Sequence, residues 1–398
     1  MANVILTPTA VTREALRILH QKLNFVGSIN RQYDDSFAKS GAKIGDTLKI
    51  RMPNRYKVRT GKTLATQDTQ EESQDLKVIT QKGVDTNFSS ADLTLSLDDF
   101  SKRILDPAMS VLAANIEYDA MSMYKDVANS IWSSGNTLTY NSVLDARVLI
   151  QRGLAPLNDR SANLNSKDMA DMVKDTKTLF NDQAQLSKQY KEGYMGRAGG
   201  FDFMENTLWP GHTRGAGDAA YVVNTSTGIT SGSATIAVTA GTGSLNKGDV
   251  ITIAGVNSVH PETKVDNGVP QQFVITADYA GGAGNITVSP TPISSNTDPK
   301  QNVVINGAGS GKAVTIAGTA SGQDTTSLVY QEDAFTFATA DLVMPNGVDF
   351  ARREVMDGIS MRIVRQYDIN NDNLPCRIDV LYGYKTLRPE WAARLHFN

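Results

Sequence analysis

The chain of 398 residues contains few of the side chains on which most active sites depend. Its single cysteine, Cys376, can form neither an internal disulfide nor a cysteine-based metal cluster. The four histidines, at positions 20, 212, 260 and 396, show no HxxxH or HExxH spacing, and no CxxC or GxSxG motif occurs. The sequence therefore predicts no catalytic residue, no metal and no cofactor, and we expect a protein that is not an enzyme.

Long apolar runs and an excess of one charge are also absent. No stretch approaches 18 consecutive apolar residues, so no membrane span is expected. The first residues lack the basic and apolar segments of a secretory signal, which favours a protein made in a reducing cytoplasm. With 39 Lys and Arg against 42 Asp and Glu, the chain lacks the basic excess of a dedicated duplex-DNA reader.

One long stretch, residues 216–329, differs in composition from the rest. It holds 11 charged residues in 114, about 10%, whereas the other 284 residues hold 70, about 25%. It also contains 16 of the 32 glycines and consists of short β-branched runs, such as GDVITIAGV and QQFVITADY, between turn residues. Regularly spaced short strands of this kind predict an all-β barrel or sandwich. The change of composition indicates a β-domain inserted into a host domain.

The host segments favour helices and a β-arm. Leu16, Leu19, Leu23 and Val26 recur at helical spacing, with Thr12 as the expected N-cap. Residues 46–62 alternate as a strand would, and residues 76–80 could return beside them, which predicts a long two-stranded arm with little burial. Such an arm is marginal on its own in water. It therefore needs another surface to lie on.

A long helix is expected after the arm. Ser96 and Asp99 resemble a capping box, and a new helix could begin at Pro107 and end near Trp132, a rod of about 38 Å. Its apolar stripe is expected to pack on a sheet. The predicted packing residues of this spine helix are Met109, Leu112, Ile116, Met123 and Val127.

Shorter elements follow the spine helix. Helices are expected at 143–152, with Ser142 as cap and Gly153 as terminator, and at 167–180. A C-terminal hairpin is predicted for 358–368 and 376–384.

Three sequence features are weak candidates for a binding or catalytic site. The Gly-rich segment 307–313 resembles a phosphate loop, but Asn306 and Ala313 replace the required Gly and Ser or Thr, so a β-turn is favoured. Acid pairs at 34–35, 71–72 and 98–99 could serve acid–base chemistry, yet acids are common in polar loops and at helix starts. Cys376 lies in a predicted strand, where a partly buried, inert thiol is the expectation.

The charges of the arm are segregated. Residues 43–62 carry seven bases and one acid, and residues 67–75 carry four acids and no base. Three interpretations stay open: a basic finger for nucleic acid, with Tyr56 the one ring for stacking; a clasp between subunits; or a solvated hairpin. The marginal stability of an isolated arm favours the clasp. Its predicted contact residues are Lys49, Arg51, Arg55, Lys57, Arg59, Asp68, Glu71, Glu72 and Asp75.

The order of these elements resembles the major capsid (coat) protein of tailed bacteriophages, and most closely the coat family of phage P22, whose shell fold carries an inserted β-domain. The likeness is carried by GRAGGFDFMENTLWP (196–210), LNKGDVITIAGV (245–256), QQFVITAD, TVSPTPI and CRIDVLYGYKTLRPEWAARL (376–395), and it covers nearly the whole chain. It implies an α+β capsid shell fold with an N-arm, an extended β-arm, a spine helix, a mixed axial domain and an inserted β-barrel.

The resemblance also implies a division of the chain and a set of partners. The expected parts are an N-terminal arm (1–42), a β-arm (43–80), a peripheral domain (81–139 and 358–398), an axial domain (140–215 and 330–357) and an inserted barrel (216–329). Hexamers and pentamers would form an icosahedral virion head around double-stranded DNA, assembled in the bacterial host cytoplasm with a scaffolding protein and a portal and with no membrane contact.

Two other classes of protein are alternatives. An adhesin or carbohydrate-binding protein would display the β-domain and should expose aromatic rings, of which residues 216–329 have only Tyr221, Phe273 and Tyr279. A hydrolase would need a pocket with paired carboxyl groups of raised pKa.

Overall fold

The computed structural model describes residues 8–33, 47–64, 66–67, 71–88, 101–176, 195–307, 309–356, 358–369 and 374–397. The chain divides into two compact units. The first unit comprises 1–51, 73–121 and 335–387, and the second comprises 52–72, 122–334 and 388–398. Within the described ranges, no helix has both the length and the apolar character needed to cross a bilayer.

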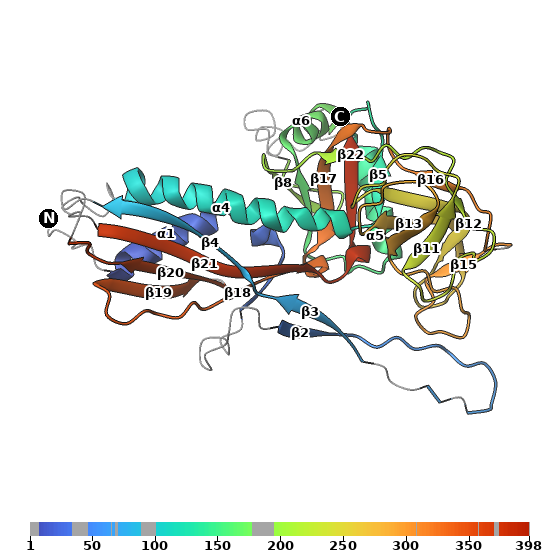
Figure 1. Cartoon of the computed structure of the whole chain (residues 1–398), viewed down its shortest axis with the longest axis horizontal. Coiled ribbons are helices and arrows are strands. Elements are labelled where there is room, and N and C mark those ends of the chain that lie inside the picture. The colour runs from blue at the N-terminus through green and yellow to red at the C-terminus, as the bar shows by residue number, and fades with distance from the viewer. Residues whose placement is uncertain are drawn as a thin grey trace. The chain divides into compact units, whose positions relative to one another are not determined.

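The first unit contains a six-stranded sheet. Its order is β1-β18-β21-β20-β19, and β4 pairs with the other edge of the long strand β21 (Figure 1). The predicted C-terminal hairpin is confirmed, since β20 and β21 are antiparallel with Arg365 opposite Cys376. The strands are β1 (Asn30–Tyr33), β4 (Thr80–Phe88), β18 (Phe335–Ala340), β19 (Phe350–Met356), β20 (Ile359–Arg365) and β21 (Leu374–Thr386).

Two helices pack in the first unit. α1 (Pro8–Lys22) contacts α4 (Asp106–Met121) and strand β19, and α4 also contacts β4 (Figure 1). A five-residue π-helix, η3 (Ser101–Leu105), leads into α4. The expected cap Thr12 is wrong, because α1 already begins at Pro8 and Thr12 is buried inside it. The capping box at Ser96 and Asp99 lies outside the described residues.

The spine helix is shorter than expected. It ends at Met121 instead of near Trp132, and a 3₁₀ turn, η4 (Ser122–Asp126), and strand β5 (Ser130–Trp132) follow. Apolar spacing continues through Val127 and Ile131, but the backbone N–H of Val127 bonds to the Tyr124 carbonyl at 3.1 Å, three residues back. Ile131 pairs with Leu395 of strand β22 (Ala392–Phe397). A strand partner distant in sequence thus overrides the local helical pattern.

The β-arm is paired only at its base. β2 (Thr47–Met52) and β3 (Glu72–Lys77) form a two-stranded sheet, and residues 53–64 contain no strand, so the expected strand over 46–62 is wrong beyond Met52. Leu48 and Ile50 of β2 pack against an apolar cluster of the first unit, which anchors the base. That cluster consists of Leu76, Val78, Ala338, Ala340, Leu342 and Leu381.

The second unit contains a mixed sheet. Its order is β5-β22-β17-β6-β8-β7, with β9 paired to β17. Helices α5 (Tyr140–Arg152) and α6 (Ser166–Thr176) contribute to its apolar core. Gly153 is the C-cap of α5, as expected, but the N-cap is Thr139, whose hydroxyl accepts from the Ser142 N–H. The remaining strands are β6 (Arg160–Leu164), β7 (Arg197–Ala198), β8 (Phe201–Glu205), β9 (His212–Thr213), β17 (Gln323–Gln331) and β22 (Ala392–Phe397).

The second unit also contains a barrel with its own core. Its sheet runs β10-β11-β14-β13-β12, and β15 and β16 both pair with β12. A bridge from Val222 to Ala313 closes the sheet on itself, so the glycine-rich stretch forms a barrel (Figure 1). The core consists mainly of the inward β-branched side chains of the alternating strands. The strands are β10 (Val222–Val223), β11 (Thr235–Thr239), β12 (Val250–Val259), β13 (Asp266–Ile275), β14 (Gly284–Ser289), β15 (Val303–Ile305) and β16 (Val314–Ile316).

The pairing of strands differs from the expected division of the chain. Residues 323–329, assigned to the barrel, belong to β17 of the mixed sheet. Residues 335–356, assigned to the axial domain, give β18 and β19 to the first unit, and residues 392–397, assigned to the peripheral domain, give β22 to the second. Composition marks the barrel but does not reveal which distant strand each segment joins, because pairing depends on non-local contacts.

Candidate assembly surface and buried polar seam

The predicted contact residues of the arm lie at its surface. Lys49 and Arg51 are exposed on β2, and Arg55 and Arg59 are exposed on the irregular segment. Lys57 is partly buried. Glu71, Glu72 and Asp75 are exposed at the start of β3, and Asp68 lies outside the described residues.

Hydrogen bonds between side chains and backbone groups hold the irregular part of the arm, residues 53–64, in shape. Gln67 accepts from the Lys57 N–H at 2.9 Å and donates to the Lys57 carbonyl at 2.6 Å, which ties the two limbs together. The Arg59 guanidinium donates to the carbonyls of Gly61 and Thr63. Even so, Val58 is 88% exposed and Leu64 78% exposed. This segment presents apolar side chains and charges to its surroundings at the same time.

Two of the predicted residues meet opposite charges within the second unit. Arg55 Nη2 lies 3.8 Å from Glu390 Oε1, and Glu72 forms an ion pair with Lys300 between β14 and β15. A cavity of about 610 Å³ lies between the arm and residues 295–300. The acid pair at 71–72 therefore takes part in a surface contact, and the pairs at 34–35 and 98–99 lie outside the described residues.

The predicted spine residues are all buried. Met109, Leu112 and Ile116 lie on α4, Met123 lies in η4, and Val127 follows it. At the residue after Ile116, the buried carboxylate of Glu117 accepts the backbone N–H groups of Phe25 and Val26 at 3.0 and 2.9 Å. The face that the apolar stripe indicates is thus a packing face.

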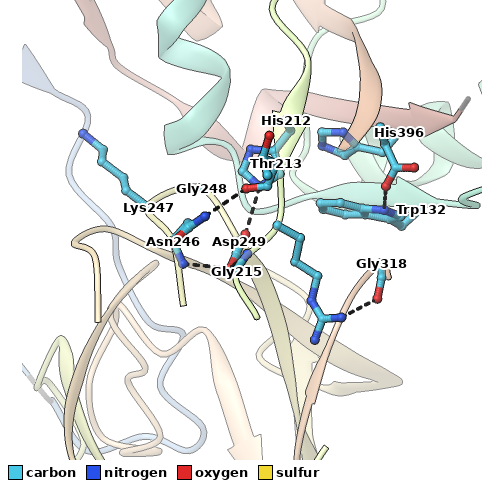
Figure 2. Close-up of polar contacts among 12 residues, drawn as sticks. Trp132, His212, Thr213, Gly215, Asn246, Lys247, Gly248, Asp249, Gly318 and His396 are labelled. Atoms are coloured by element: carbon cyan, nitrogen blue, oxygen red, sulfur yellow. Dashed lines mark hydrogen bonds and ion pairs between the residues drawn. The ribbon is translucent and has the colours of Figure 1, made fainter. Parts of the chain in front are cut away.

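A buried polar seam, which the sequence did not reveal, joins the barrel to the mixed sheet. His212 of β9 places its Nε2 atom 2.9 Å from Asp249 Oδ1 (Figure 2). Its Nδ1 atom lies 3.2 Å from the hydroxyl of Tyr124. The other oxygen of Asp249 accepts the N–H groups of Gly215 and Asn246, at 3.0 and 2.8 Å. The Asp249 carboxylate therefore contacts three groups: the His212 ring, the Gly215 N–H in the connection into the barrel, and the Asn246 N–H in the barrel loop before β12.

Strand β22 supplies the other face of the seam. Arg394 is completely buried and donates to the Gly248 carbonyl at 2.8 Å. His396, two residues further along, stacks on Trp132 with ring centroids 4.0 Å apart (Figure 2). Trp132 Nε1 donates to Asp324 Oδ2 at 2.6 Å. Residues two apart on a strand share a face, so Arg394 and His396 lie on the same face of β22.

Burial shifts the pKa values of two groups in the seam. It lowers the pKa of the Arg394 guanidinium to about 10. It also holds the pKa of His396 well below its usual range, and the nearby Arg394 and His212 lower it further. The ring atom His396 Nε2 and the Arg394 atoms Nε and Nη2 have no hydrogen-bond partner in the described part of the chain. The seam therefore favours the neutral form of the His396 imidazole.

The sequence contains one signal that could have indicated this seam. In the run AARLHFN, Arg394 and His396 alternate with Ala393, Leu395 and Phe397. That alternation predicts a strand with one apolar and one polar face. Since all six residues of β22 are buried, the polar face has to meet polar partners from another element. No local pattern identifies Asp249 or Tyr124 as those partners.

The weak candidates have structural roles. Cys376 is buried in β21, and burial raises the pKa of its thiol to about 12, which keeps it protonated. Residues 307–313 connect β15 to β16, and Lys312 donates to the Asn306 carbonyl at 2.7 Å. In the described ranges, no group of three His, Cys, Asp or Glu side chains is arranged to hold a metal ion.

An exposed charged arm on a pair of well-packed units is typical of a structural subunit whose surfaces are completed by other molecules. The chain belongs to the P22 coat protein family: the family model described as "P22 coat protein - gene protein 5" matches residues 29–395. It is therefore a structural major capsid protein of a bacteriophage, with a place in the virion capsid and assembly into multimeric shells. The expected α+β capsid fold is confirmed, and the alternative of an adhesin is not supported.

Several solved structures are similar to the chain. One from Mycobacterium phage Che8 has a TM-score of 0.48 and 11% identity, and the match covers 94% of this chain and 90% of that one. The mature capsid of bacteriophage PhiM1 has a TM-score of 0.41 and 11% identity, with 94% and 87% covered. The CUS-3 coat protein I-domain has a TM-score of 0.19 and 29% identity, with 26% and 98% covered. Comparison with curated protein sequences gives no significant match.

Proposed function

We propose that this coat protein forms hexamers and pentamers of an icosahedral head that encloses double-stranded DNA. In this proposal the β-arm, residues 43–80, lies over a neighbouring subunit, and the barrel stabilises the subunit or its contacts with neighbours. The observation that supports the proposal best is the irregular segment 53–64. Its backbone makes no strand, and it exposes Tyr56, Val58 and Leu64 beside its bases.

The energetics of the arm favour an intermolecular contact. A two-stranded sheet of six-residue strands is marginal in water, so the β2–β3 pair alone cannot stabilise the segment beyond it. Burying the exposed apolar side chains against another subunit would contribute about 25 cal/mol per Å². The segregated charges would then fix the register of the contact and disfavour wrong partners.

The charge balance supports a container for DNA. Outside residues 216–329 the chain has 35 bases and 35 acids. A strongly basic inner surface would bind the phosphate backbone tightly through counterion release, whereas a balanced one allows DNA to be packed and later released. We propose further that a scaffolding protein and a portal take part in assembly in the bacterial cytoplasm, and that the role involves no catalysis and no cofactor.

The barrel gives no support to sugar binding. Tyr221 and Phe273 are completely buried in the barrel core, and Tyr279 is partly buried against it. The described part of residues 216–329 therefore offers no exposed ring on which a sugar could stack.

The decisive experiment is assembly of the purified chain, with a charge reversal in the arm. Wild-type protein should sediment as capsomers or shells, and electron microscopy should show closed particles. The triple variant Arg51→Glu, Arg55→Glu, Arg59→Glu should keep the circular dichroism spectrum of a folded subunit but give at least tenfold fewer particles. A matched triple reversal outside the arm, at Arg13, Lys174 and Arg197, should assemble better than the arm variant. Normal particles from the arm variant would exclude the arm contact, and a lasting wild-type monomer would exclude the proposed function.

A further inference from the structure

A basic cleft lies between the irregular segment of the arm and the barrel loop 295–300. It encloses about 610 Å³, and its lining includes Arg55, Lys57 and Arg59 from the arm and Lys300 from the loop. The one acid in its lining is Asp298. We call these residues the basic cleft.

Contacts within the second unit shape the basic cleft. Gln67 bonds to both backbone groups of Lys57, which holds the outgoing and returning limbs together. Glu72 pairs with Lys300 at the opposite wall, and Arg55 approaches Glu390 at 3.8 Å. The cleft is therefore formed before any partner arrives, and preorganisation of this kind lowers the entropy lost on binding.

The basic cleft retains an excess of positive charge. Among the described residues, the Lys57 ammonium makes no ion pair, and the Arg59 guanidinium bonds to uncharged carbonyls only. Burial lowers the pKa of Lys264, and the nearby charges of Arg55 and Lys57 lower it further, although Asp298 acts in the opposite direction. The acids near the cleft thus leave part of its charge uncompensated, and an anionic partner would be attracted.

The lining favours a peptide over a nucleic acid. It includes the apolar side chains of Val58 and Pro299, and it contains no aromatic ring on which a base could stack. The chain has a stretch of matching chemistry, since residues 68–75 carry four acids and no base within eight positions.

We propose that the basic cleft binds the acidic run 68–75 of a second copy of this chain, so that arms of neighbouring subunits are linked in series. The inference rests on the proposed shell function, because only an assembly supplies neighbouring copies in fixed geometry. It names the partner of the arm more closely: Lys57 and Arg59 of one arm contact the acids of the next arm. Such charge-paired contacts set partner and register more than total affinity.

The test uses unassembled full-length subunit and a fluorescently labelled peptide of residues 66–76, TQDTQEESQDL, followed by anisotropy at 50 mM salt. We expect saturable binding that weakens at least fivefold in 500 mM salt. A peptide with its four acids changed to amides should bind at least tenfold more weakly. The variant Lys57→Glu should lose at least fivefold in affinity, whereas Lys62→Glu, the same change outside the cleft lining, should keep wild-type affinity.

The possible outcomes separate this inference from the shell function. Equal binding of the peptide by wild type and Lys57→Glu would contradict binding of the acidic run at the basic cleft, whether or not wild-type protein forms shells. Binding of a twelve-nucleotide oligothymidylate in place of the peptide would also overturn it and would favour a nucleic-acid contact. In assembly, Lys57→Glu should slow particle formation at least threefold, and the added reversal Glu71→Lys should restore part of the rate. Failure of wild-type protein to form any shell would contradict the proposed function but not the peptide result.

Discussion

His212 Nε2 lies 2.9 Å from Asp249 Oδ1, and both side chains are almost completely buried. His212 belongs to β9 of the mixed sheet, and Asp249 directly precedes β12 of the barrel. The apolar cores of the sheet and the barrel are separate clusters, so this pair joins two cores through polar contacts. A buried polar contact is stabilising only while every partner is present. The attachment of the barrel should therefore depend strongly on single residues.

Replacing the carboxylate should show this dependence. We expect Asp249→Ala to lower the free energy of unfolding by about 3 kcal/mol, because it leaves His212 and two backbone N–H groups without their acceptor. The control is Asp278→Ala, which also removes an acceptor of a backbone N–H, that of Lys247, but at an exposed position. It should lower the free energy by less than about 1 kcal/mol. Urea unfolding of both variants measures the difference, and equal losses would contradict the role of the seam.

The seam should also make stability depend on pH. The folded protein holds the pKa of His396 below its unfolded value of about 6.5, so the unfolded chain binds the proton more readily. Stability is therefore fully present above about pH 6.5 and falls as the pH drops toward the folded pKa, by up to about 1.4 kcal/mol per unit. The groups that face His396 are Arg394, His212, Trp132 and the Thr326 hydroxyl, and the Thr325 backbone acts in the opposite direction.

Unfolding curves between pH 5.0 and 7.5 measure this slope. Wild-type protein should lose up to about 2 kcal/mol across that range through this group. His396→Phe keeps a ring against Trp132 but cannot take up a proton, so its profile should be flatter over the same range. If both proteins lose stability in parallel, His396 is not the source of the pH dependence.

The sequence predicted the parts of the fold that repeat locally. The composition of residues 216–329 indicated an all-β barrel or sandwich, and the alternation after Cys376 indicated the hairpin of β20 and β21. The spine helix shows the limit of such patterns. Its apolar spacing continues past Met121, yet the chain there turns and pairs with β22, some 260 residues later in sequence. A periodic pattern identifies a buried face but not the element that covers it.

The same limit explains why the seam was missed. Single polar residues in apolar runs, such as Arg394 and His396, have buried partners that depend on the tertiary arrangement. The charges of the arm were visible because they form continuous runs of one sign. Their contacts with Lys300 and Glu390 were not visible, because those residues lie in unrelated segments.

The packing of the spine helix can be tested with two adjacent residues. Leu112 is 2% exposed and Val111 is 58% exposed on α4. Leu112→Ala should lower the free energy of unfolding by about 2–5 kcal/mol, because it removes buried methyl groups and leaves a cavity. Val111→Ala should change it by less than about 0.5 kcal/mol. Thermal unfolding of the two variants gives the comparison, and a large loss in the Val111 variant would show that the outer face of α4 is also packed.

The base of the arm depends on a close backbone approach at Gly383 of β21. A Cβ atom there would lie 2.2 Å from the Lys77 carbonyl oxygen and 3.0 Å from the Val78 Cα, so one of the two backbones would have to shift. Gly383→Ala should therefore lower the free energy of unfolding by about 1–3 kcal/mol. It should also reduce particle yield, because Lys77 ends β3 and a shift there moves the arm. The control is Gly27→Ala, where a Cβ would meet no atom within 4 Å and where the change should be within about 0.5 kcal/mol. Urea unfolding and sedimentation of assembled particles measure the two effects, and wild-type behaviour of the Gly383 variant would mean that β3 and β21 can separate without loss.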